Sequence, residues 1–138
     1  METIKAYTNV EQSRKLEEIL PIESADMWWS RCTITDFGDG VLKVSYAVEP
    51  CNISQFRNTK EDIPCWSLSA LISIIPQELF DGEYIINITE GWDNRWILTY
   101  DYYDENRNHS YYGLSASADN LVDACTDIII KLKERNII

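Results

Sequence analysis

Apolar residues recur at helical spacing near both ends of the chain. Residues 8–20 carry a modest apolar stripe, and Thr8 or Asn9 can accept hydrogen bonds from the free N–H groups at the start of such a helix. Pro21 ends this helix, because proline cannot continue the helical hydrogen-bond pattern. A second stripe follows Asn120, another residue suited to capping, and predicts a C-terminal helix. Its apolar positions are Leu121, Cys125, Ile128 and Leu132.

Residues 63–76 predict a further helix in the middle of the chain. Pro64 lies near its start, where the missing N–H group does no harm, and Pro76 lies past its end. A strand is the weaker alternative, since the stretch is rich in isoleucine but also holds Ala70 and two prolines. The helical stripe consists of Leu68, Leu71, Ile72 and Ile75.

Apolar and polar residues that alternate with a period of two predict two antiparallel hairpins. Asp39-Gly40 favours the positive φ angles that the turn of the first hairpin needs. The second hairpin joins two runs of β-branched and aromatic residues, and a third strand can follow it. The expected strands are residues 32–35 and 41–48 in the first hairpin, 84–89 and 95–103 in the second, and 110–114 in the third strand.

Two stretches show neither the helical spacing of apolar residues nor the alternation typical of strands. We expect residues 22–29 to form a connection or a short turn, and residues 50–62 to form a surface loop. The elements then predict a single α+β domain over residues 1–138, with the order α-β-β-α-β-β(-β)-α and an antiparallel sheet with helices mainly on one face. Its expected core includes Leu20, Leu71, Ile75, Trp96, Leu98, Cys125, Ile128 and Leu132.

The excess of acidic residues limits which partners the domain can bind. The 138 residues include 12 Lys and Arg against 23 Asp and Glu, which gives a formal net charge of −11. Nucleic acids and anionic membranes bind clusters of cations, so we expect neither as a direct partner. The N-terminus lacks the pattern of a signal peptide, and no apolar run reaches the roughly 20 residues of a membrane span, so we expect a cytoplasmic protein.

Few residues of the sequence occur in patterns that are typical of catalytic or metal sites. The four cysteines have no metal-ligand or redox spacing, no glycine-rich phosphate loop occurs, and the single histidine, His109, lies in a polar stretch that predicts a solvated loop. The sequence therefore assigns no catalytic residue, no metal and no cofactor. One enzymatic alternative stays open: Cys65 lies at the predicted start of a helix, where free N–H groups can stabilise a thiolate for a small hydrolase or transferase.

Acidic and aromatic residues are interleaved in residues 81–118. Trp and Tyr at a surface are favoured anchors for a protein partner. We therefore predict a non-enzymatic interaction protein with a basic protein partner; the alternatives are that the rings fill the core, that the acidic surface mimics nucleic acid, or that copies of the chain form a homo-oligomer. The candidate interaction residues are Trp92, Asp101, Tyr102, Tyr103, Asp104, Tyr111 and Tyr112.

Four short motifs are spread over both ends and the middle of the chain. They read E-Q-S-x-x-L from Glu11, L-P-I-E-S-A-D-M from Leu20, I-P-C-W-S-L-x-A-L from Ile63 and D-N-x-V-D-A-C from Asp119. In these motifs the chain resembles a family of small uncharacterised proteins encoded by gut Bacteroidales and by their phages and mobile elements. The family has no established activity, so the resemblance implies no functional residues. It implies a setting: an intracellular accessory protein of mobile DNA that acts by binding another protein.

Overall fold

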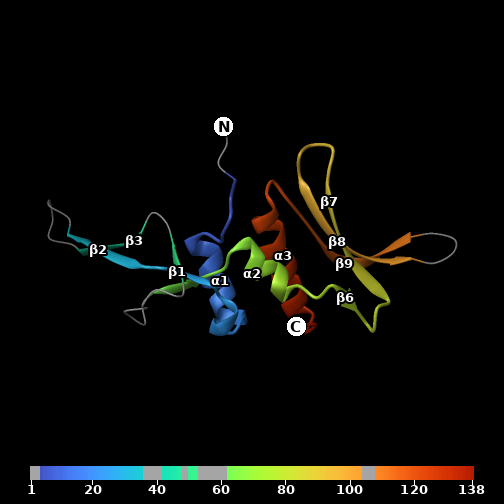
Figure 1. Cartoon of the computed structure of the whole chain (residues 1–138), viewed down its shortest axis with the longest axis horizontal. Coiled ribbons are helices and arrows are strands. Elements are labelled where there is room, and N and C mark those ends of the chain that lie inside the picture. The colour runs from blue at the N-terminus through green and yellow to red at the C-terminus, as the bar shows by residue number, and fades with distance from the viewer. Residues whose placement is uncertain (1–3, 36–41, 48–49, 53–61, 104–107) are drawn as a thin grey trace. The chain divides into compact units, whose positions relative to one another are not determined.

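The computed structural model describes residues 4–35, 42–47, 50–52, 62–103 and 108–138. These residues belong to two compact units (Figure 1): an N-terminal unit, Tyr7–Ser67, and a C-terminal unit, which combines Met1–Ala6 with Leu68–Ile138. Helices and antiparallel strands occur in both units, so the predicted α+β class is confirmed. The predicted single-domain organisation stays a prediction.

The N-terminal unit begins with helix α1 (Val10–Ile19). Asn9 caps it in a reciprocal arrangement, in which its side chain accepts a hydrogen bond from the backbone of Gln12 and its own backbone N–H donates to the Gln12 side chain. Six further elements follow Leu20: a short helix and the five strands of two small sheets. They are the 3₁₀ helix η1 (Ile22–Ser24), a two-stranded sheet of β2 (Arg31–Thr35) and β3 (Leu42–Tyr46), and a three-stranded sheet in the order β4 (Cys51–Asn52), β1 (Met27–Trp29), β5 (Ile63–Cys65).

Three expectations for this unit were wrong in part. The predicted helix over 63–76 begins as strand β5, in which Pro64 pairs with Trp28 of β1. Proline is tolerated there because β5 is an edge strand, where a missing N–H group removes no hydrogen bond to a further strand. The connection at 22–29 contains strand β1, and the surface loop at 50–62 begins with β4, which pairs with the same strand. The Asp39-Gly40 turn of the first hairpin and residues 53–61 lie outside the described residues.

The C-terminal unit is a four-stranded antiparallel sheet with two helices. Its strand order is β6-β7-β8-β9, which agrees with the predicted second hairpin and its third strand. In chain order the elements are α2 (Leu68–Ile74), β6 (Glu78–Leu79), β7 (Tyr84–Glu90), β8 (Trp96–Tyr103), β9 (Asn108–Ala118) and α3 (Leu121–Glu134).

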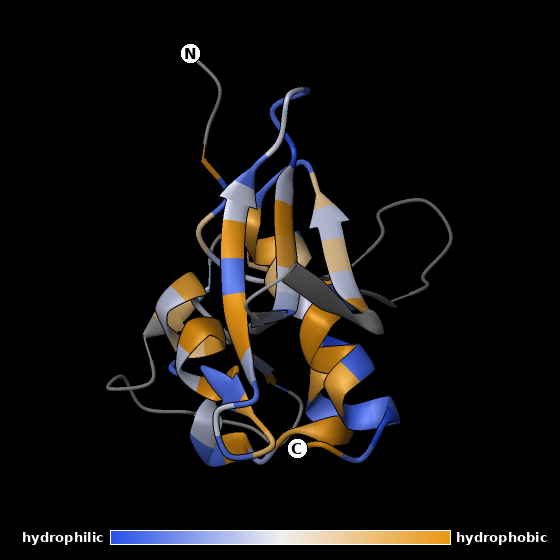
Figure 2. Ribbon diagram, turned by 90° about the vertical axis from the view of Figure 1, so that its right-hand side faces the viewer, coloured by the Kyte–Doolittle hydropathy of each residue, from blue (hydrophilic) through white to orange (hydrophobic). Residues whose placement is uncertain are grey.

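Burial along β8 and along the second half of β9 follows the pleat of the sheet. Leu98 and Tyr100 are completely buried, whereas Thr99 between them is partly exposed. Figure 2 shows that hydrophobic and hydrophilic residues are both present along the strands of this sheet. Helix α3 packs against β8 and β9 and also contacts α2, so the two helices of this unit lie together on one side of its sheet. The Tyr100 hydroxyl donates to the carbonyl of Pro76 at 2.5 Å, which ties β8 to the end of α2.

Most of the predicted core is confirmed. Six of the eight residues are buried, and the two exceptions, Leu20 and Trp96, are partly exposed. Asn120 caps α3 as predicted, accepting a hydrogen bond from the Asp123 backbone. The buried six are Leu71, Ile75, Leu98, Cys125, Ile128 and Leu132.

Candidate interaction surface

The surface at the β6–β8 end of the C-terminal unit is strongly acidic. Residues 77–94 contain no lysine or arginine, and we call them the acidic segment. The side chains of all five of its carboxylates are exposed, so their charges reach solvent without a cation of the same segment to balance them. The five are Glu78, Asp81, Glu83, Glu90 and Asp93.

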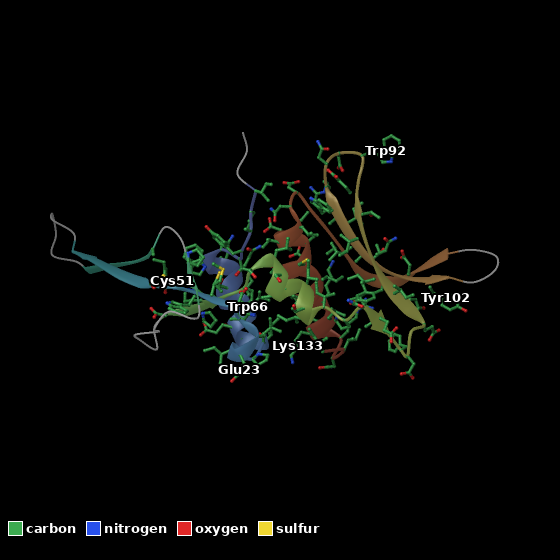
Figure 3. The ribbon with its side chains drawn as sticks, viewed as in Figure 1. Glu23, Cys51, Trp66, Trp92, Tyr102 and Lys133 are labelled. Carbon is green, nitrogen blue, oxygen red and sulfur yellow. The ribbon has the colours of Figure 1, made fainter. Side chains whose placement is uncertain are left out.

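Trp92 lies at the tip of the β7–β8 hairpin and is fully exposed (Figure 3). The turn that carries it is held by a 2.6 Å hydrogen bond from the Gly91 N–H to the Arg95 carbonyl. Asn94 takes the left-handed conformation at φ 62°, which asparagine tolerates better than most residues. Trp92 is therefore a large apolar ring presented on an ordered turn between the exposed carboxylates Glu90 and Asp93.

Arg95, the cation next to this turn, forms its hydrogen bonds and ion pair with Ser117 and Asp119. Arg95 donates to the Ser117 hydroxyl and carbonyl at 3.1 Å each, and it pairs with Asp119 at 3.1 Å. These bonds fasten β8 to β9 and to the segment that leads into α3. The positive charge of Arg95 is thereby directed to β9 and Asp119 and away from Glu90 and Asp93.

A second aromatic group lies at the other end of β7. The Tyr84 ring contacts both Phe80 and Tyr102, with ring centroids 6.0 Å and 5.8 Å away, and Phe80 is half-exposed. Phe80 and the next two residues all have positive φ angles, of 54°, 56° and 88°, which folds β6 back into β7 as a tight turn. Sequence reasoning missed Phe80 and Tyr84. The Asp81-Gly82 dipeptide, a strong turn signal beside an aromatic residue, could have identified them.

The predicted aromatic patch is therefore divided into two parts. Trp92 lies beyond the Glu90 end of β7, whereas Tyr102 pairs with the Tyr84 end of the hairpin (Figure 3). The seven residues of β7 span about 20 Å at the usual rise of a strand. A single side chain of a partner cannot contact both parts, but an extended segment of a partner can.

The other predicted interaction residues lie on or near the β8–β9 pair. Asp101 is not at the surface: it is about 9 % exposed and accepts hydrogen bonds from the Asn87 amide at 3.1 Å and the Thr99 hydroxyl at 3.2 Å. It sits where the pairing of β8 with β9 shifts register, and it bonds both β7 and its own strand there. The structure places the backbones of Tyr103, Tyr111 and Tyr112 in β8 and β9, whereas their side chains and all of Asp104 lie outside the described residues.

His109 is also part of a strand, which corrects the expectation of a loop. Its backbone lies in β9 and pairs with Tyr102 of β8. Its side chain lies outside the described residues. The pairing of β8 with β9 resumes after its register shift and extends to Tyr103, further than the polar sequence around His109 suggested.

Cys65 is buried and does not lie at the start of α2, where the sequence had placed it. It belongs to β5, and α2 begins only at Leu68. Its Sγ donates to the Thr8 carbonyl at 3.4 Å and lies 3.5 Å from the Thr8 hydroxyl. Burial raises the pKa of the thiol above its ordinary value, since a thiolate loses solvation in an apolar interior. A buried, protonated thiol suits packing and opposes the role of a nucleophile.

Two further properties bear on what the surface can bind. Among the described residues, no group of three or more His, Cys, Asp or Glu side chains is arranged to hold a metal ion. None of the helices in the described part of the chain has the length and apolar character that crossing a bilayer requires.

Comparisons with protein-family models, with curated proteins and with solved structures find no match to this chain. The case for a function therefore depends on the chemistry of the surface.

Proposed function

We propose that the protein is a non-enzymatic interaction protein that binds a basic protein partner through the acidic segment and Trp92. The exposed Trp92 ring is the observation that carries this proposal. A tryptophan side chain offers about 200 Å² of mostly apolar surface, so its burial in a partner is worth about 5 kcal/mol before the costs of association. Tryptophan is among the residues that most often dominate the energy of an interface.

Charge supplies the second support for the proposal. Glu90 and Asp93 flank the ring and are exposed, and the whole chain carries a net charge of −11. An acidic surface raises the rate of encounter with a basic partner and repels acidic competitors. Electrostatics would then select the partner, and burial of the ring would supply much of the affinity.

The proposal includes a setting. The resemblance to proteins of Bacteroidales and their phages suggests an accessory protein of mobile DNA that acts in the cytoplasm. Free cysteines agree with a reducing compartment, since Cys51, Cys65 and Cys125 form no disulfide. The enzymatic alternative that uses Cys65 has the less favourable geometry, because its thiol is buried and its pKa is raised.

Affinity capture from a lysate of the organism that encodes the chain tests this proposal. Wild-type protein is compared with Trp92→Ala and with the control Ile22→Ala, which shortens another exposed apolar side chain on η1. We expect one basic protein to be retained by wild type and by the control and to be depleted at least tenfold with Trp92→Ala. Titration of the purified partner should show the same order of affinities, and both should weaken as salt rises. A partner retained equally by Trp92→Ala would contradict the proposal, and so would the absence of any specific partner.

A further inference from the structure

An apolar groove runs beside the outer edge of β7. It has a volume of about 280 Å³ and is formed by α2, the segment that follows α2, and β7. Three of its isoleucines are substantially exposed: Ile72 by 43 %, Ile85 by 50 % and Ile88 by 39 %. Figure 2 shows hydrophobic stretches along the outermost long strand of the sheet and along the helix beside it. The lining residues are Ile72, Ile75, Gln77, Ile85, Ile86 and Ile88.

The backbone at this edge is only partly paired. Strand β6 pairs with Tyr84 and Ile85 alone, and the Ile86 N–H donates to the Gln77 carbonyl at 2.9 Å. Because backbone groups of a strand alternate between its two neighbours, the N–H groups of Ile88 and Glu90 point to the same outer side as that of Ile86. Within the part of the chain that the structure describes, no strand pairs with this side of β7 beyond Ile86.

A free edge beside an apolar groove is the surface that strand addition uses. The added strand bonds to the open backbone groups, while alternate side chains enter neighbouring pockets. An exposed apolar edge is otherwise an aggregation hazard that proteins cover or protect with charge.

The charges of the acidic segment determine which strand can be added. Two copies of β7 paired antiparallel would bring Asp81 and Glu83 of one copy to the end that holds Glu90 and Asp93 of the other. Like charges facing each other across a strand pair are destabilising, so a second copy is disfavoured. A strand with lysine or arginine at its outward positions would instead face opposite charge at both ends.

The geometry points to β7 as a docking edge for an extended partner segment that alternates apolar and basic residues. Its backbone pairs with Ile88 and Glu90, its apolar side chains enter the groove at Ile72 and Ile88, and its cations face the exposed carboxylates. This inference rests on the proposed function, since it names the kind of partner segment that the same acidic hairpin receives. An extended segment also has the reach to contact both ends of β7.

A synthetic ten-residue peptide that alternates valine and lysine is the probe. Its matched control has the same sequence and charge but N-methyl groups on alternate backbone nitrogens, which removes the hydrogen bonds of one edge. Titration into isotope-labelled full-length protein is followed by NMR. We expect saturable shifts at the Ile88 and Glu90 amides, slower hydrogen exchange at both, and at least tenfold weaker binding of the methylated peptide.

Three variants separate edge pairing from general attraction between opposite charges. Ile88→Pro removes the outward N–H without touching the bonds to β8, and it should abolish peptide binding in protein that remains folded. Glu83→Lys with Glu90→Lys keeps all backbone groups, so it covers the case in which the proline variant fails to fold, and it should weaken binding at least tenfold. Glu17→Lys with Glu18→Lys makes the same change in net charge on α1, and it should weaken binding less than threefold.

The inference is overturned if both peptides bind equally, if the α1 control is as damaging as the β7 variant, or if no peptide binds. It is also overturned if sedimentation shows a wild-type dimer that Ile88→Pro dissociates, since a second copy would then occupy the edge. These results differ from failure of the proposed function: capture of a basic partner that depends on Trp92 and survives Ile88→Pro would leave that function standing and remove only the docking edge.

Discussion

Replacement of Thr8 by valine tests whether a buried hydroxyl holds the N-terminal unit together. Thr8 is completely buried. Its Oγ1 accepts a hydrogen bond from the Trp66 N–H at 3.1 Å and lies 2.7 Å from the Ser13 hydroxyl. Valine has nearly the same shape but offers neither acceptor nor donor, so Thr8→Val leaves both of these buried groups without this partner. The backbone hydrogen bond from the Thr8 N–H to the Trp66 carbonyl is kept, because it does not involve the side chain.

The expected cost follows from the two groups affected. An unsatisfied buried polar group costs about 1–3 kcal/mol, and the Ser13 hydroxyl can rotate toward another acceptor, so we expect Thr8→Val to lose about 2–4 kcal/mol. That is a large share of the roughly 5–15 kcal/mol by which a domain is stable. Ser13→Ala added to Thr8→Val removes one of the two buried groups left without a partner. The double variant should therefore lose less free energy of unfolding than the sum of the losses of the two single variants.

Urea denaturation followed by tryptophan fluorescence measures the free energy of unfolding, and amide exchange at Trp66 reports the site itself. The matched control is Thr89→Val, which makes the same change at an exposed position of β7 and should alter the free energy by less than about 0.5 kcal/mol. If Thr8→Val is as stable as wild type and Trp66 exchanges no faster, the reasoning about this buried hydroxyl is refuted.

Two further predictions concern the positive φ angle of Gly82 and the dependence of stability on the ionisation of Cys125. Gly82 has φ 88°, so Gly82→Ala should destabilise the C-terminal unit by about 1 kcal/mol in thermal or urea unfolding, and Gly82→Asn should cost less; equal stability of all three would contradict the strain. Burial raises the pKa of Cys125 from 9.0 to about 11. The unfolded chain therefore loses this proton first, so the stabilisation from Cys125 is complete below pH 9 and is lost as pH rises toward 11. Urea midpoints from pH 8 to 11 should fall more steeply for wild type than for Cys125→Ser, and parallel curves would refute the assignment.

Local signals predicted the elements whose contacts are local. Asn9 and Asn120 cap α1 and α3 because the donors they satisfy lie within the next three residues. The β7–β8 hairpin was visible for the same reason, since its two strands are neighbours in sequence and alternate with a clear period.

The errors occur where a distant segment decides the outcome. Pro64 looked like a helix start, but its pairing with Trp28 makes it part of an edge strand. Cys65 supported the enzymatic alternative through its expected place at a helix start, but it lies in β5, and Thr8, which lies 57 positions earlier, helps to enclose it. Asp101 looked like an outward carboxylate, but a register shift in β8 and the Asn87 amide hold it inside.

By itself, the sequence determined the charge, the α+β class, the caps, the second hairpin and most of the core, because each depends on composition or on spacing within one element. Only the tertiary structure decided that the aromatic residues form two groups at opposite ends of β7, that Cys65 is enclosed, and that no strand of the described residues pairs with the edge of β7 beyond Ile86, beside an apolar groove. Those properties depend on which strands pair and where a pairing stops, and the free energy of pairing comes from groups far apart in the chain.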